Sequence, residues 1–129
     1  MKRTNGIKAL KKLIGNTDGN LYVRWSRGFA KDLKQGRSRD YLAGGEHAGL
    51  SAVKIDPEWS TDEKWLARRM TEYRFLRMKD GLIGCHIYSG REVGKDSDGY
   101  ESITDISHVA TLNNALIDEL VEIKNNEWT

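Results

Sequence analysis

Residues 21–40 hold the densest group of side chains that could bind a ligand. The group consists of one tryptophan and four arginines: Trp25, Arg24, Arg27, Arg37 and Arg39. The guanidinium group presents five donors in a planar fork that matches phosphate and carboxylate oxygens. An indole ring can stack on a base or on another ring. We therefore predict that this segment holds an anionic ligand, of which a nucleotide is one example.

Strand geometry places two members of this group on opposite faces of the predicted sheet. The run from Leu21 to Trp25 is β-prone, and neighbouring residues of a strand point to opposite faces. Arg24 and Trp25 therefore cannot face one ligand from the same side. The alternative is structural: Arg24 pairs with a carboxylate at the edge of the core, Trp25 lies in the core and Asp40 caps a turn. The sequence leaves both interpretations open.

A second basic group lies on the helix expected around residues 60–76. It contains Arg68 and Arg69, followed by Arg74 and Arg77. Arg68 and Arg69 would extend the binding face if this helix packs beside the first group. Otherwise these charges form a solvated side of an amphipathic helix.

Several chemistries lack the residues that they need. The three histidines, His47, His86 and His108, show no metal-ligand spacing. Cys85 is the single cysteine, which excludes an internal disulfide and a cysteine zinc cluster. Its neighbour His86 must face the other side of a strand, so we expect Cys85 to be a small buried residue. We expect no metal ion and no resident cofactor, and with no complete catalytic motif we favour a protein that is not an enzyme.

Length and composition fit one globular domain. The 129 residues are 38% hydrophobic and 31% charged, a balance typical of folded domains. The N-terminus lacks the apolar core of a signal peptide, and no apolar run would span a bilayer as a helix. We therefore expect a cytoplasmic protein without a membrane partner. The formal charge of +2 is too small to indicate nucleic acid by itself.

The two ends of the chain carry opposite charge. Residues 1–20 hold five basic residues, Lys2, Arg3, Lys8, Lys11 and Lys12, against Asp18. Residues 112–129 hold four acidic residues, Asp118, Glu119, Glu122 and Glu127, against Lys124. We divide the chain into a basic N-terminal helix with its linker, residues 1–20, and one domain over residues 21–129. Nucleic acid is one partner that the N-terminal helix could bind.

Hydrophobic spacing predicts an α+β fold with a mostly antiparallel sheet. The sheet packs with a central and a C-terminal helix, and the N-terminal helix is an accessory. The expected helices are residues 7–14, 29–33 and 60–76, and a further helix begins near residue 111. The expected strands are residues 21–25, 50–55, 82–88 and 100–106. The third of these strands continues over residues 91–93, and residues 95–99 form the turn before the fourth.

Capping signals predict where two of these helices begin. Ser60 and Glu63 have the spacing of a capping box. Trp65 and Met70 then belong to one apolar helix face. Thr111 is the expected N-cap of the C-terminal helix.

Two strings of residues resemble a family of small bacterial proteins known only as a domain of unknown function. They are Leu21-Tyr22-Val23-Arg24-Trp25-Ser26-Arg27-Gly28, and Ser38-Arg39-Asp40-Tyr41 running on to Gly49-Leu50-Ser51. The likeness runs from about Leu21 to Leu112 and leaves the N-terminal helix outside. It implies a shared fold, and the family has no assigned activity to carry over.

The order of elements also resembles that of ADP-ribosyltransferase-type domains. Those domains use NAD and place an arginine on an opening strand, a serine at the start of a later strand and a glutamate further on. Arg24, Ser51 and Glu101 stand in these places here. The usual Ser-Thr-Ser is Leu-Ser-Ala around Ser51, and no Glu/Gln-x-Glu motif includes Glu101. The resemblance is one of fold, which transfers function poorly.

Three functions of different classes follow. The favoured one is a binding protein whose arginines hold an anionic small molecule or an acidic protein surface. The second is NAD-dependent ADP-ribosyl chemistry at Arg24, Ser51 and Glu101. The third is a mobile-element protein that inhibits a host or defence complex by surface contact, which the separation of charge between the two ends of the chain motivates.

Overall fold

The described part of the chain combines a strand layer with a helix layer. The computed structural model describes residues 3–4, 6–17, 19–26, 30, 32–33, 49–71, 84–95 and 100–127. The strands are β1 (Arg3–Thr4), β2 (Leu21–Ser26), β3 (Leu50–Lys54), β4 (Gly84–Lys95) and β5 (Glu101–Leu112). The helices are α1 (Ile7–Asn16), the 3₁₀ helix η2 (Pro57–Thr61), α3 (Glu63–Met70) and α5 (Asn114–Glu127). The predicted α+β class is confirmed.

Strands β2 to β5 pair in a closed ring. β2 pairs with β3 and with β4, and β5 pairs with the same two strands, always antiparallel. β4 and β5 are each 12 residues long and can serve two neighbours because they bend. Their ladder shifts register at three places along the hairpin, and such bulges increase strand curvature. The short β1 runs parallel to the end of β5.

Side chains fill the inside of this ring, because a barrel of so few strands has no room for an open lumen. Strand alternation turns every second residue of β2 and β4 inward. The buried apolar residues on this inner side are Tyr22, Leu50, Ala52, Tyr88, Ile103 and Ile106. The polar residues that continue this inner side form the candidate site.

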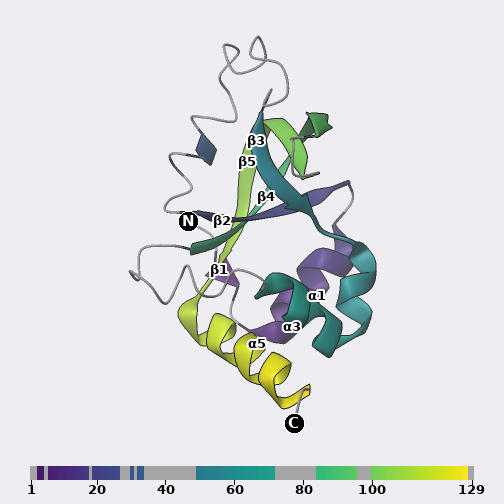
Figure 1. Cartoon of the computed structure of the whole chain (residues 1–129), viewed down its shortest axis with the longest axis vertical. Helices are drawn as coiled ribbons and strands as arrows, with labels where there is room; N and C mark the ends of the chain where they lie inside the picture. Colours follow the sequence, from purple (N-terminus) through teal and green to yellow (C-terminus); the bar gives the residue numbers. More distant parts are fainter. Residues whose placement is uncertain are drawn as a thin grey trace.

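The opposite side of β2 and β4 faces the helices, which lie together at one end of the molecule (Figure 1). Leu21, Val23, Cys85 and Ile87 pack there in one core with residues of α1, α3 and α5. Cys85 is buried, as expected, and burial raises the pKa of its thiol well above the ordinary value. A thiol in that state is a poor nucleophile.

Helix α1 contributes directly to this core. Ile7, Leu10 and Ile14 recur on one face and are buried in the same cluster as the strand residues. The lysines between them lie outside, and Lys11 approaches Glu63 of α3 at 3.5 Å. The helix expected as an accessory is thus packed against the body of the domain.

The start of α3 differs from the prediction. Asp62 is the N-cap, and its side chain accepts a hydrogen bond from the Lys64 amide at 2.9 Å. Ser60 and Thr61 lie in η2, where their hydroxyls donate to backbone carbonyls of that 3₁₀ turn. The predicted capping box is wrong because Pro57, suited to the first turn of a helix, begins a separate 3₁₀ helix.

Two other helix predictions are also wrong. Trp65, expected on the apolar face, is 44% exposed and has the Arg68 guanidinium over its ring. Thr111 belongs to β5, and Asn113 caps α5 by accepting from the Leu116 amide at 2.8 Å. Thr111 lies in the strand because it still pairs with His86 of β4 and with Arg3 of β1.

We predict that Leu10→Ala lowers the free energy of unfolding by about 2–5 kcal/mol, the usual cost of truncating a fully buried leucine. Leu10 is 0% exposed. Urea unfolding followed by circular dichroism measures the effect. The matched control is Lys12→Ala on the exposed face of α1, which should change stability by no more than about 0.5 kcal/mol. If Leu10→Ala unfolds at the wild-type midpoint, α1 is a detachable accessory after all.

Candidate functional site

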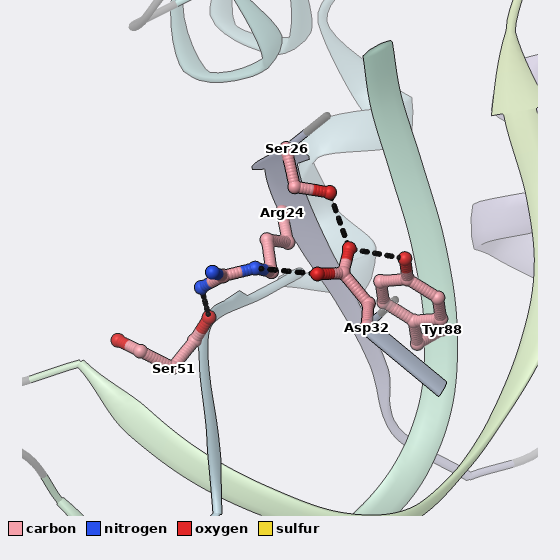
Figure 2. Close-up of polar contacts among 5 residues, drawn as sticks. All are labelled: Arg24, Ser26, Asp32, Ser51 and Tyr88. Carbon is pink, nitrogen blue, oxygen red and sulfur yellow. Dashed lines mark hydrogen bonds and ion pairs between the residues drawn. The ribbon is translucent and has the colours of Figure 1, made fainter. Parts of the chain in front are cut away.

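A buried carboxylate anchors the polar group on the inner side of the ring. Asp32 is 3% exposed. Its Oδ1 accepts from Arg24 Nε at 3.2 Å, its Oδ2 accepts from the Tyr88 hydroxyl at 2.6 Å, and the Ser26 hydroxyl donates to the same Oδ2 (Figure 2). A buried charge is stable only where such partners compensate it. Asp32 therefore ties its short helical segment, described at residues 30 and 32–33, to β2 and β4.

Arg24 also spans the gap between β2 and β3. The two strands are in register as far as Val23 and Val53, and the pairing then stops. Its continuation would set Trp25 opposite Ser51. Instead, Arg24 Nη1 donates to the Ser51 carbonyl at 2.7 Å. The guanidinium thus supplies a donor that the backbone ladder would otherwise provide, since a carbonyl without a donor is costly in a sheet.

A hollow of about 190 Å³ lies where these strands diverge. Its described lining residues are Val23, Arg24, Trp25, Ser51, Ala52, Val53 and Tyr100. Most of them are apolar or aromatic, and Arg24 is the charged one. The Arg24 side chain is 30% exposed and that of Asp32 is 4% exposed. Arg24 is therefore the partly accessible member of the ion pair and a lining residue of the hollow, whereas Asp32 is buried.

Two histidines share one hydroxyl on the same inner side. His86 Nδ1 and His108 Nε2 each lie 2.8 Å from Thr111 Oγ1, and the two ring centroids are 6.0 Å apart. A neutral pair fits this arrangement, because a hydroxyl can donate to one ring nitrogen and accept from the other. Gly84 leaves room for the His86 ring, since a Cβ at that position would lie 2.7 Å from His86 Cε1 and the ring would have to shift.

Burial shifts the acidity of these groups. It raises the pKa of Tyr88 well above its ordinary value, and the hydrogen bond to Asp32 adds to the effect. It lowers the pKa of His86, with a smaller contribution from His108. It also lowers the pKa of His108. The inner side therefore favours a neutral phenol and neutral imidazoles.

Glu101 is placed apart from the Arg24 network. It pairs with Ala52 in the β3–β5 ladder, one residue from Ser51. Its carboxylate accepts from the Lys54 amide at 3.3 Å and lies 3.5 Å from Lys95 Nζ. Ser51 turns its carbonyl oxygen toward Arg24, and its hydroxyl points away (Figure 2). The three residues of the enzyme alternative thus lie on adjacent strands, with their functional groups directed differently.

The arginines predicted to bind a ligand have different surroundings. Arg24 and Trp25 face opposite sides of β2, as expected, and the Trp25 indole donates to the Met70 carbonyl at 3.0 Å. Arg68 and Arg69 lie over the rings of Trp65 and Trp59, at 5.7 and 5.1 Å from the ring centroids. Arg27, Arg37 and Arg39 lie outside the described residues, as do Asp40, Arg74 and Arg77. Among the predicted binding residues that the structure describes, Arg24 and Trp25 line the hollow, and Arg68 and Arg69 do not.

Sequence reasoning missed most of the polar partners. The sequence analysis gives Asp32 no role, and the spacing of His86 and His108 gives no sign that they meet. A usable signal exists in strand alternation: Arg24 and Ser26 alternate with apolar residues on β2, and His86 and Tyr88 do so on β4. A strand with one polar and one apolar face next to a helix layer points to an inward polar cluster.

The described residues offer neither a metal site nor a membrane-spanning helix. Within the described ranges, no three side chains of His, Cys, Asp or Glu are grouped as a metal site requires. No helix among the described elements is long and apolar enough to cross a membrane. The expectations of no resident metal and no cofactor stay predictions.

We predict that Asp32→Ala lowers the free energy of unfolding by about 3–5 kcal/mol, because Arg24 loses its buried counter-charge. Tyr88→Phe removes a single hydrogen bond to the carboxylate and should cost about 1.5–3 kcal/mol. Chemical denaturation measures both. The control is Glu122→Ala on the exposed side of α5, with an expected change within about 0.5 kcal/mol. Equal losses for Asp32→Ala and Glu122→Ala would contradict a central role for Asp32.

We predict that acid weakens the fold partly through His86. Its folded-state pKa is lowered by burial, so the unfolded chain binds the proton more tightly. This contribution to stability is complete above the unfolded value of about 6.5 and is lost as the pH falls from there through the lowered folded-state pKa. Urea unfolding at about pH 7.5 and about pH 5 should show a smaller acid loss for His86→Gln than for the wild type. An identical loss in both proteins would show that His86 is not involved.

Comparison with known proteins identifies a family and no function. No curated protein and no solved structure matches the chain. A family model described as "Family of unknown function (DUF6098)" matches residues 1–127, which confirms the expected membership of an uncharacterised family. The match extends past residues 21–112 and includes α1. The chain therefore belongs to this family of unknown function.

Proposed function

We propose that this protein is a non-enzymatic binding protein that holds an anionic ligand in the hollow beside Arg24. The observation that supports this is a guanidinium held at two points and lining a hollow. Nε is fixed by Asp32 and Nη1 by the Ser51 carbonyl. An arginine ordered in advance loses less conformational freedom when a ligand binds.

The arrangement leaves donors for a ligand. The hydrogen bonds that Arg24 makes within the described residues use Nε and Nη1, so both hydrogens of Nη2 are left for an acceptor. Asp32 lies behind the guanidinium and shares its negative charge with Tyr88 and Ser26. Trp25 and Tyr100 add aromatic surface to the same hollow.

The proposal rests on Arg24 and Trp25 and does not depend on the other predicted arginines. Arg68 and Arg69 stack on tryptophan rings, which explains them as packing of η2 and α3. Arg27 follows the last residue of β2 in the sequence and lies outside the described residues.

We predict that Arg24→Lys weakens binding of inorganic phosphate or AMP at least about tenfold, which corresponds to 1.4 kcal/mol. Lysine keeps the charge that Asp32 requires but lacks the planar fork. Nuclear magnetic resonance titration of the full chain measures the affinities. The control is Arg91→Lys, since Arg91 pairs with the exposed Asp105 at 3.1 Å on the far part of the hairpin. Equal affinities for the wild type and Arg24→Lys would show that Arg24 does not bind the anion.

A second candidate is NAD-linked ADP-ribosyl chemistry. The observation that favours it is the contact between Arg24 and Ser51 on neighbouring strands, with Glu101 on the next strand opposite Ala52. The same titration with NAD tests it: NAD should bind, and Glu101→Gln should abolish turnover without abolishing binding. No binding of NAD at millimolar concentration would exclude this candidate.

A further inference from the structure

The geometry points to a more specific ligand: we infer that the hollow between β2 and β3 takes the carboxylate of a small organic acid with an apolar or aromatic body, and not the phosphate of a nucleotide. This inference rests on the proposed function, since it names the class of anion that Arg24 would hold. Three observations carry it: the size of the hollow, the character of its walls and the charge behind Arg24.

The size of the hollow admits a single ring. Its volume is about 190 Å³, while a protein cavity of about 150 Å³ accommodates benzene. Sites for drug-sized ligands start at about 300 Å³. A six-membered ring with one carboxylate therefore fits the volume that the described residues enclose, and a nucleotide would need more room than this hollow provides.

The walls of the hollow suit an apolar body. Val53 comes from the last paired position of β2 and β3, and Trp25 and Tyr100 supply aromatic surface. Val23 and Ala52 also line the hollow but are buried, at 0% and 4% exposed. The Trp25 indole N–H is already used by the Met70 carbonyl. The ring thus contributes its apolar surface to the hollow.

The charge distribution favours a monoanion. Arg24 is the charged residue among the described lining side chains, and Asp32 lies on its other side with 3.2 Å between Arg24 Nε and Asp32 Oδ1. The pair is neutral in sum. A phosphate monoester carries a charge of about −1.5 to −2 at neutral pH and would be repelled more strongly by Asp32 than a carboxylate of single charge. With Nε bonded to Asp32 and Nη1 bonded to the Ser51 carbonyl, the carboxylate would accept a charge-assisted hydrogen bond from Nη2.

The test is to titrate the full chain separately with benzoate, benzyl alcohol, inorganic phosphate and AMP. Nuclear magnetic resonance measures the binding of each compound. The Trp25 indole N–H signal, assigned through Trp25→Phe, reports on the hollow. Benzoate should bind at least about tenfold more tightly than phosphate or benzyl alcohol, a difference of 1.4 kcal/mol. Arg24→Lys should weaken benzoate binding about tenfold or more.

Two variants separate the hollow from other surfaces. Val53→Phe fills it and should abolish benzoate binding, with the fold checked by its unfolding transition, while Arg91→Lys should bind benzoate as the wild type does. Where Val53→Phe fails to fold, the Arg24→Lys result decides. If phosphate or AMP binds through Arg24 and benzoate does not bind more tightly, the inference is wrong and the proposed function stands. If benzyl alcohol binds as well as benzoate, the carboxylate is not recognised and the inference is wrong. If none of the anions binds through Arg24, both the inference and the proposed function are wrong.

Discussion

The buried charge of Asp32 is the constraint on which the inner side of this barrel depends. A carboxylate that is 3% exposed must be compensated where it lies, because water does not solvate it. Arg24 and Ser26 come from β2 and Tyr88 comes from β4, so the compensation works only when these two strands are paired and the segment containing Asp32 lies against them. The Asp32 carboxylate thereby makes the position of its own short helical segment depend on how β2 pairs with β4.

Arg24 connects this constraint to the hollow. The same side chain that compensates Asp32 also donates to the Ser51 carbonyl, which allows β2 and β3 to separate after Val23 and Val53 without leaving that carbonyl without a donor. The hollow beside Trp25 is a consequence of this separation. A structural role and a ligand-binding role for Arg24 are therefore not exclusive: the pairing with Asp32 is what would hold the guanidinium ready for an anion.

The rest of the fold supports the two strands from the other side. The helices cover the apolar face of β2 and β4, and α1 belongs to that layer through Leu10 and its neighbours. The bends in the long hairpin bring His86 and His108 to one hydroxyl of Thr111. Because burial lowers the pKa of both rings, this part of the inner side is organised as a network of neutral groups beside the charged pair.

The sequence by itself determined the elements and their faces. Alternation along residues 21–25 placed Arg24 and Trp25 on opposite sides, and apolar spacing identified α1, β3 and the hairpin of β4 and β5, because these patterns depend only on local geometry.

The tertiary structure alone decided which side chains meet. Asp32 lies eight residues from Arg24 and 56 from Tyr88 in the chain, and His86 meets His108 only through a ladder with shifted register. The N-cap of α5 is Asn113 and not Thr111 for the same reason, since Thr111 still pairs with strands far from it in the sequence. Periodicity fixes the face on which a residue lies, whereas its neighbours depend on register and on bulges, which no local pattern encodes.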